Sequence, residues 1–189
     1  MSVEIQIAIL GVLGTLGGTI LGWFLNNLSK RGKLNIFVTL WKDTFEYKSD
    51  IGSMEISTSK EQTEYFKYYV SLDLYNSCGE PKIMRNIKIV FADNKKTMFE
   101  SVPQDDRAKR VSYPIVFYED VSAVNIPAKM VVKLNLHNGF WKDEKKEDDT
   151  IELLWKVNTI YLQYLDENNK KRKVELKKEE YNEYFSKLE

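Results

Sequence analysis

The chain shows two patterns of hydrophobic positions, which meet at about residue 30. From Ile5 to Leu25 the sequence IQIAILGVLGTLGGTILGWFL contains no charged residue. As a helix this stretch is about 30 Å long, which matches the hydrocarbon thickness of a bilayer. A buried helix of a soluble protein normally keeps a polar stripe, whereas the interior of this segment offers only Thr and Gly. We therefore predict a transmembrane anchor over residues 1–28.

Beyond residue 33 apolar and polar positions alternate with a period of two, which is typical of half-buried strands. The inward positions are expected to be Val70, Leu72 and Leu74, then Ile87, Ile89 and Phe91, then Val132, Leu134 and Leu136. Further strands are expected at Leu34–Trp41, Met54–Thr58, Val111–Tyr118, Trp155–Leu165 and Arg172–Lys177. Turn residues separate them at 76–81, 93–94, 138–139 and 166–169.

Strands at this spacing, without long helices between them, predict an all-β fold, an antiparallel sandwich or barrel over residues 34–189. At its end, Tyr181, Tyr184, Phe185 and Leu188 recur at helical spacing within Lys178–Leu188. We expect a short amphipathic helix there, covering a sheet edge or docking on a partner or on the membrane surface.

The flanks of the apolar segment predict its orientation. Lys30, Arg31 and Lys33 lie in or beside a stub of residues 29–33, while Glu4 is the side-chain charge on the other side. The positive-inside rule then places the N-terminus outside and the C-terminal domain in the cytosol, at the cytoplasmic (inner) membrane. A cleavable signal peptide is the alternative, but positive charge does not precede the segment and no small-residue cleavage site follows it.

The apolar segment also carries a small-residue face. Its members are Gly11, Gly14, Thr15, Gly18 and Gly22, with Ile9, Leu13, Leu16, Ile20 and Phe24 on the opposite side. Small residues at this spacing let two helix backbones approach closely in lipid. We predict self-association or pairing with another span; the alternative is a solitary helix that tolerates its glycines.

Composition narrows the function. The 189 residues are 43% hydrophobic and 30% charged, with 28 basic and 28 acidic side chains, so a packed core is expected and nucleic acid is disfavoured as a partner. One cysteine, Cys78, excludes an intramolecular disulfide and suits a reducing compartment. With one histidine as well, an intrachain Cys/His zinc cluster is excluded.

Candidate chemistry is sparse. His137 falls on the polar side of a strand just before the Asn138-Gly139 turn, and we interpret it as solvent-facing. Cys78 has no histidine near it in sequence, so we expect no catalytic residue, cofactor or metal site, and no enzyme. The acidic pairs Asp105-Asp106 and Asp148-Asp149 lack the ligand alternation of calcium loops. They are interpreted as solvated loop charge, and Lys142–Asp149 as a mobile exposed loop.

Basic clusters are more suggestive. One loop is expected to carry Arg107, Lys109 and Arg110, and the last hairpin carries Lys170, Lys171, Arg172 and Lys173. A domain tethered under a membrane could bring such an edge against anionic headgroups. The same edge could bind a nucleotide or nucleic acid, and ordinary solubility charge is the plain alternative.

Three stretches carry a resemblance that covers most of the chain: LYNSCGEPKIMRNIKIVF, VNIPAKMVVKLNL and VNTIYLQYLDENNKKRKVEL. Together with the preceding span and basic stub, they resemble small bacterial membrane-anchored proteins with an immunoglobulin-like sandwich. The resemblance implies an Ig-like fold and carries no chemistry; similar anchored sandwiches occur among phage-defence effectors. Asn168-Asn169 stands where the family's last hairpin turn usually has Gly.

The sequence as a whole predicts a single-pass protein whose cytosolic sandwich binds or senses, with the lipid bilayer, a second copy and an unidentified cytosolic protein or small ligand as partners. Two alternatives stay open. One is a defence-like effector whose clustered spans perturb the bilayer on a cytosolic cue. The other is an enzyme with an unrecognised carboxylate site.

Overall fold

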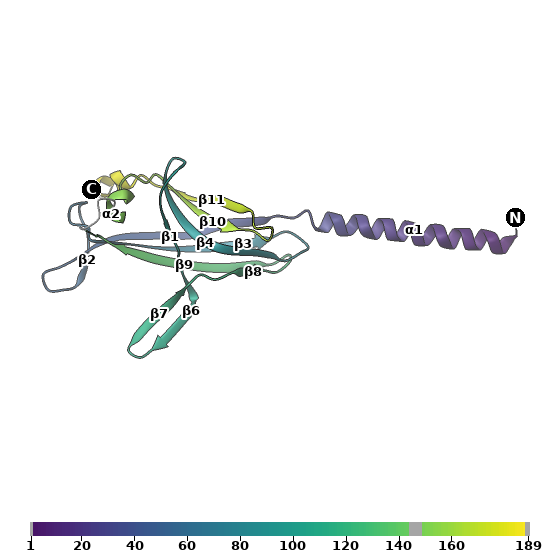
Figure 1. Cartoon of the computed structure of the whole chain (residues 1–189), viewed down its shortest axis with the longest axis horizontal. Coiled ribbons are helices and arrows are strands. Elements are labelled where there is room, and N and C mark those ends of the chain that lie inside the picture. Colours follow the sequence, from purple (N-terminus) through teal and green to yellow (C-terminus); the bar gives the residue numbers. More distant parts are fainter. Residues whose placement is uncertain (1, 144–148, 188–189) are drawn as a thin grey trace.

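One long helix projects from a folded β domain in the computed structural model, which describes residues 2–143 and 149–187 (Figure 1). The helices are α1 (Val3–Ser29) and α2 (Thr150–Leu154), and two 3₁₀ turns follow at Tyr181–Glu183 and Phe185–Lys187. The strands are β1 (Leu34–Lys48), β2 (Met54–Ile56), β3 (Tyr65–Asn76), β4 (Lys82–Asp93), β5 (Lys96–Ser101), β6 (Gln104–Ser112), β7 (Ile115–Asp120), β8 (Val124–Ile126), β9 (Val131–Trp141), β10 (Thr159–Leu165) and β11 (Lys171–Lys178).

The strands form two antiparallel sheets. Sheet A has the order β2-β1-β3-β9-β6-β7, and sheet B has the order β11-β10-β4-β5 with β8 added on β4. Strand β3 pairs with β1 on one side and with β9 on the other along nearly its whole length. The predicted all-β sandwich with one N-terminal apolar helix is confirmed.

The core lies between the sheets, at the positions that the alternation predicts. Leu72 and Leu74 of β3, Ile89 of β4 and Leu134 of β9 are all fully buried. At one end the core becomes aromatic, where Phe45 packs against Phe66, Trp155, Tyr181, Tyr184 and Phe185. Aromatic rings bury large areas, so this cluster ties the C-terminal segment to the sandwich.

The expected helix over Lys178–Leu188 is present as two 3₁₀ turns rather than one amphipathic α-helix, and Leu188 lies outside the described residues. The Tyr181 side chain is completely buried, and its hydroxyl donates to Asp43 Oδ2 at 2.6 Å. Because Tyr184 and Phe185 pack on the same Phe45 ring, the backbone follows the aromatic contacts in tight turns.

Several predicted boundaries were wrong. Strand β1 continues beyond Trp41 to Lys48, and β10 begins only at Thr159, after α2. The expected strand Val111–Tyr118 is a hairpin that turns between β6 and β7. The expected turn at Asn138-Gly139 lies inside β9, paired with Tyr68 and Lys67. In β1 and β9 the local pattern is overridden by pairing with β3, which lies far away in the sequence.

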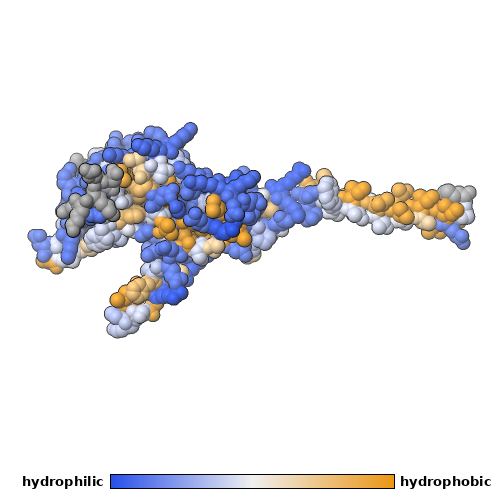
Figure 2. Space-filling model, in the orientation of Figure 1, coloured by the Kyte–Doolittle hydropathy of each residue, from blue (hydrophilic) through white to orange (hydrophobic). Residues whose placement is uncertain are grey.

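Helix α1 stands apart from the sandwich, and none of its residues is buried. It is long and apolar enough to cross a membrane, and Figure 2 shows its hydrophobic surface as a continuous stretch away from the hydrophilic domain. Its large side chains are exposed, for example Leu10 at 69% and Ile20 at 66%. An apolar surface of this size normally marks contact with lipid or with another protein.

Candidate functional site

An open groove lies on the outer face of sheet A and has a volume of about 630 Å³. Strand β3 contributes Tyr65, Lys67 and Tyr69, which alternate with the buried Phe66 and Tyr68. The remaining walls come from Lys42 and Thr44 of β1, Gln104 and Asp106 of β6, Tyr118 of β7, and His137, Asn138, Gly139 and Trp141 of β9. The groove therefore combines aromatic faces with a few charged and amide groups, as ligand-binding surfaces do.

Two aromatic rings form the floor at one end of the groove. The rings of Tyr65 and Trp141 are 4.6 Å apart and tilted by 35°. The Tyr65 ring lies so close to Gly139 that a Cβ added at Gly139 would be 2.0 Å from the Tyr65 hydroxyl. Burial, with a smaller effect of Glu46, raises the pKa of Tyr65, so the phenol stays neutral. Trp141 is 57% exposed.

His137 holds one wall of the groove in place. Its Nδ1 lies 2.7 Å from Asp106 Oδ1, a contact that becomes an ion pair when the imidazole is protonated. The Tyr118 ring meets the imidazole edge-on, with 4.5 Å between centroids. Burial and the charge of Asp106 raise the pKa of the neighbouring Tyr69. The expected solvent-facing strand end is therefore wrong for His137, which is in mid-strand and three-quarters covered.

Strands β6 and β7 form a hairpin, here called the arm (residues 104–120), that leaves the sandwich beyond its pairing with β9 (Figure 1). Only Gln104 and Asp105 pair with His137 and Leu136 of β9. The exposed apolar side chains of the arm are Val111, Tyr113, Ile115, Val116 and Phe117. Tyr113 is 96% exposed at the tip, and Figure 2 shows hydrophobic surface there. Such an arm adds little to the core and suits contact with a partner.

The first predicted basic cluster lies on strand β6 of the arm and not in a loop. The Arg107 guanidinium binds both carboxylate oxygens of Asp105, with Nη2 to Oδ2 at 2.6 Å. Burial opposes the charge of Asp105, but these bonds and the Arg107 backbone N–H outweigh it and lower the pKa of the carboxyl. Arg110 pairs with Glu119. Of the three predicted cations, Lys109 is the one without an ion pair among the described residues.

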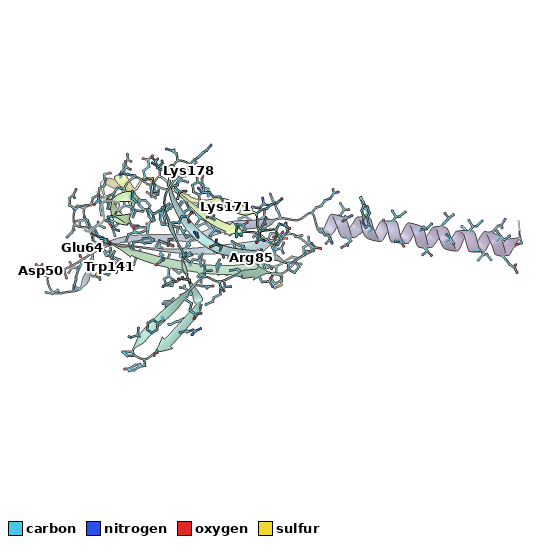
Figure 3. All side chains as sticks on the ribbon, viewed as in Figure 1. Asp50, Glu64, Arg85, Trp141, Lys171 and Lys178 are labelled. Carbon is cyan, nitrogen blue, oxygen red and sulfur yellow. The ribbon has the colours of Figure 1, made fainter. Side chains whose placement is uncertain are left out.

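The second predicted basic cluster lies at the other end of the domain, at the turn between β10 and β11. Asp166 accepts hydrogen bonds from the backbone N–H groups of Asn168 and Lys170 and from Arg172 Nε, all at 2.8–2.9 Å. Lys173 lies over the Tyr161 ring at 4.0 Å. Lys171, at the start of β11, lies away from the arm (Figure 3), so the two predicted basic clusters do not form one surface.

The juxtamembrane residues are not a loose linker. Backbone hydrogen bonds join Gly79 N–H to Ser29 O at 2.8 Å and Ser77 N–H to Lys33 O at 3.0 Å. Lys30 pairs with Glu80 at 2.8 Å. The buried Cys78 thiol lies 3.1 Å from the Lys30 carbonyl oxygen. We call residues 29–34 together with the β3–β4 turn (77–81) the joint; it fixes the end of α1 to the sandwich.

The predicted small-residue face of α1 is open. A Cβ added at Gly11, Gly14, Gly18 or Gly22 would meet no atom within 4 Å, apart from the helix's own backbone. Thr15 and Thr19 direct their hydroxyls back to the carbonyls of Gly11 and Thr15 at 2.9 Å. The face therefore presents backbone and methyl groups only.

Among residues 2–143 and 149–187, no group of three or more His, Cys, Asp and Glu side chains gathers as a metal site would require. The interpretation of Asp105 and Asp149 as solvated loop charge is wrong: Asp105 lies in β6, is buried and binds Arg107, and Asp149 is buried just before α2. Asp148, and most of the predicted loop Lys142–Asp149, fall outside the described residues.

Sequence reasoning missed the groove. Its signal was the alternation of Tyr65, Lys67 and Tyr69 on the polar face of β3, opposite His137, Gly139 and Trp141 on β9. Aromatic residues on a face that should be polar are the feature to look for.

The model of the YopI Ig-like domain family matches residues 32–177. A curated relative, the SPbeta prophage-derived uncharacterized protein YopI of Bacillus subtilis (strain 168), is 24% identical over 166 residues, covering 87% of this chain and 90% of that protein. The match to the relative extends beyond the Ig-like domain, since it covers more of this chain than residues 32–177.

Among solved structures, a protein from Bordetella pertussis named ApaA superposes with a TM-score of 0.37 at 9% identity, covering 79% of this chain and 93% of its own. An uncharacterized beta-sandwich protein from Clostridium difficile 630 superposes with a TM-score of 0.32 at 9% identity, covering 77% of this chain and 86% of its own.

Proposed function

This chain belongs to the YopI Ig-like domain family, and from that premise we propose that it is a non-enzymatic, membrane-tethered binding module. Helix α1 anchors the protein in the membrane, and the joint fixes the orientation of the sandwich relative to α1. The groove of sheet A and the arm bind a protein partner. Tethering raises the effective concentration of the domain toward other proteins at the membrane. The chemistry supports binding over catalysis because His137 contacts a carboxylate and an aromatic ring, with no nucleophile in the contact.

The tether is supported by α1 itself. From Ile7 to Leu25 its exposed side chains are apolar except for Thr15 and Thr19, and Trp23 near the end of this stretch is 66% exposed, as interfacial indoles are. Lys30, Arg31 and Lys33 follow the helix, so the positive-inside rule favours a cytosolic sandwich at the inner membrane.

The binding surface is supported by one observation above all: an exposed apolar arm borders an aromatic groove, and the base of the arm pairs with β9. Asp106 and Tyr118 of the arm both contact His137 of β9. A fixed arm loses less conformational entropy on binding than a free loop would. The mixture of apolar tip, exposed Trp141 and unpaired Lys109 suits a protein surface better than a small polar ligand.

Site-specific photo-crosslinking tests this surface. A benzoylphenylalanine at Tyr113 on the arm, or at Trp141 in the groove, is expected to give adducts with the same partner in cells of the source organism. Ile51, 88% exposed in the β1–β2 loop, is the matched apolar control off the groove. Adducts of equal yield from all three positions, or none from Tyr113 and Trp141, would contradict the proposed surface.

We also propose that the spans associate through the small-residue face, because every glycine on it is open to a neighbour. Gly18→Leu should lower the mass of the detergent-solubilised assembly, while Leu13→Ile on the opposite face should not. An unchanged assembly mass for Gly18→Leu would contradict packing through this face. Growth arrest on expression that Gly18→Leu abolishes would favour the membrane-perturbing, defence-like alternative.

A further inference from the structure

The joint leaves a polar pocket beside the end of α1. It has a volume of about 310 Å³ and is lined by residues of the joint, of β4 and of the β10–β11 hairpin. The lining residues are Gly32, Lys33, Leu34, Lys82, Ile83, Tyr164, Asp166, Glu167 and Arg172. Figure 3 shows Arg85 and Lys171 at this same end of the sandwich, toward α1. We call this cavity the joint pocket.

The depth of the joint pocket relative to a bilayer follows from the length of α1. If Ile5–Leu25 fills the hydrocarbon core, the remaining helix from Asn26 to Ser29 spans about 6 Å, close to the thickness of one headgroup layer. Lys33 follows four residues later, and hydrogen bonds to Ser77 fix its backbone. The joint pocket therefore opens at the level of the lipid phosphates or just beyond them.

The charge at this end is strongly positive. The cations are Lys30, Arg31, Lys33, Lys82, Arg85, Lys129, Lys170, Lys171 and Arg172, and the acids at the same end are Glu80, Asp166 and Glu167. Glu100 lies nearby but is bound to Lys88 at 2.6 Å. The whole chain is formally neutral, whereas this end carries nine cations and three acids. Its net positive charge therefore distinguishes it from the rest of the protein.

The acids of the joint pocket are already engaged. Glu167 pairs with Lys82, and Asp166 takes Arg172 and the turn amides. Burial alone would raise the pKa of Asp166, but these donors lower it, so it stays ionised and structural. Lys33, Lys170 and Lys171 are exposed and make no ion pair among the described residues. They are free to meet an anion from outside.

We propose that the joint pocket, which Lys33 lines, and Lys170, whose backbone N–H bonds to the pocket residue Asp166, bind the phosphate of an anionic phospholipid in the leaflet from which α1 emerges. The inference rests on the proposed membrane tether and adds a lipid class to it. Phosphate matches the ammonium donors in charge, and the pocket's place beside the span selects lipid over a soluble phosphate. Each cation near an anionic surface contributes roughly fivefold in partitioning, so the cluster acts through its number.

The test uses the full chain in nanodiscs of 80% phosphatidylcholine and 20% phosphatidylglycerol. Native mass spectrometry counts the lipids that remain bound when the disc is removed. We expect the lipids retained by wild type to show a ratio of phosphatidylglycerol to phosphatidylcholine at least fivefold above the 1:4 ratio of the disc, and Lys33→Glu/Lys170→Glu to lose this enrichment. Lys95→Glu/Lys96→Glu is the matched control: the same charge change at an exposed turn, at the opposite end of β4 from Arg85.

The outcomes separate the two proposals. Equal enrichment in wild type and Lys33→Glu/Lys170→Glu, in chains that resist alkaline extraction, overturns the lipid site and leaves the tether standing. Extraction of wild type by alkaline carbonate overturns both. Inorganic phosphate at 10 mM that abolishes the enrichment assigns the pocket to a soluble phosphate and overturns the lipid assignment. If Lys33→Glu/Lys170→Glu and the control Lys95→Glu/Lys96→Glu lose the enrichment equally, the enrichment depends on net charge alone. That result also overturns the lipid site.

Discussion

Substituting one glycine should open the joint while leaving the sandwich folded. Gly32 packs so closely on the β3–β4 turn that an added Cβ would lie 2.2 Å from the Ser77 carbonyl oxygen and 2.3 Å from Cys78 Cα. Ordinary contact begins at 3.4 Å, and the neighbours are backbone atoms that cannot swing aside. Gly32→Ala must therefore separate the two segments by about 1 Å, which is enough to break hydrogen bonds near 3.0 Å.

The cost follows from the bonds at risk. Ser77 N–H donates to Lys33 O at 3.0 Å, Lys33 N–H to Ser77 Oγ at 2.9 Å, and Gly79 N–H to Ser29 O at 2.8 Å. At about 1 kcal/mol each, their loss destabilises the closed joint by about 2–3 kcal/mol. Hydrogen exchange at the Ser77 and Gly79 amides should then accelerate by roughly 30- to 150-fold. The amide of Leu72 in the sandwich core should keep its protection.

The measurement is amide exchange on the full chain in nanodiscs. Gly17→Ala is the control, because a Cβ there meets nothing within 4 Å and Gly17 lies off the small-residue face. Equal exchange at Ser77 and Gly79 in wild type and Gly32→Ala would refute the packing argument. Equal acceleration at Leu72 would show that the substitution unfolds the domain instead of opening the joint.

Three further predictions concern the groove, the hairpin turn and the core. Gly139→Ala should push the Tyr65 ring aside, change the fluorescence of the neighbouring Trp141 and lower the crosslinking yield at that groove position; unchanged fluorescence would count against the contact between the two rings. Asp166→Asn should cost about 1–2 kcal/mol of unfolding free energy at pH 7 by urea titration. The difference from wild type should shrink as the pH falls through the lowered pKa of Asp166, below its ordinary 3.8, and a constant difference down to pH 2.5 would refute this. Phe91→Ala, at a fully buried ring, should cost about 3–5 kcal/mol, and a loss under 1 kcal/mol would show that the core repacks around it.

The sequence predicted the sandwich because β3 and β9 are buried mainly on one face. Period-two alternation in β3 and β9 reports directly which side chains lie between the sheets. The same logic failed for the arm, since β6 and β7 leave the core and face solvent on both sides. Because most side chains of β6 are at least partly exposed, the segment around Arg107 and Lys109 lacks an apolar alternation, and its charged residues indicated a loop.

The groove escaped prediction for a different reason. Asn138-Gly139 has the composition of a turn, but here the glycine makes room for the Tyr65 ring across the sheet. The Asn138 amide donates to the Val102 carbonyl at 2.8 Å, outside its own strand. Tyr65 and Val102, which make these two contacts, are more than thirty positions away from Asn138-Gly139 in the sequence. A local sequence pattern therefore cannot predict them. The joint is likewise a long-range product, since Lys33 meets Ser77 only in the fold.

The most direct test of the account is where the full chain resides and in what form. Membranes from cells that express the full chain are washed with alkaline carbonate, and the intact mass of the retained protein is measured by mass spectrometry. The account predicts a pelleted chain that keeps α1, with its sandwich cut by added protease only after the inner membrane is opened. Replacing Leu13 and Leu16 by Lys, at about 2.5–3.5 kcal/mol of insertion cost each, should release it. A wild-type chain that washes off intact, or one that has lost α1, would contradict the account.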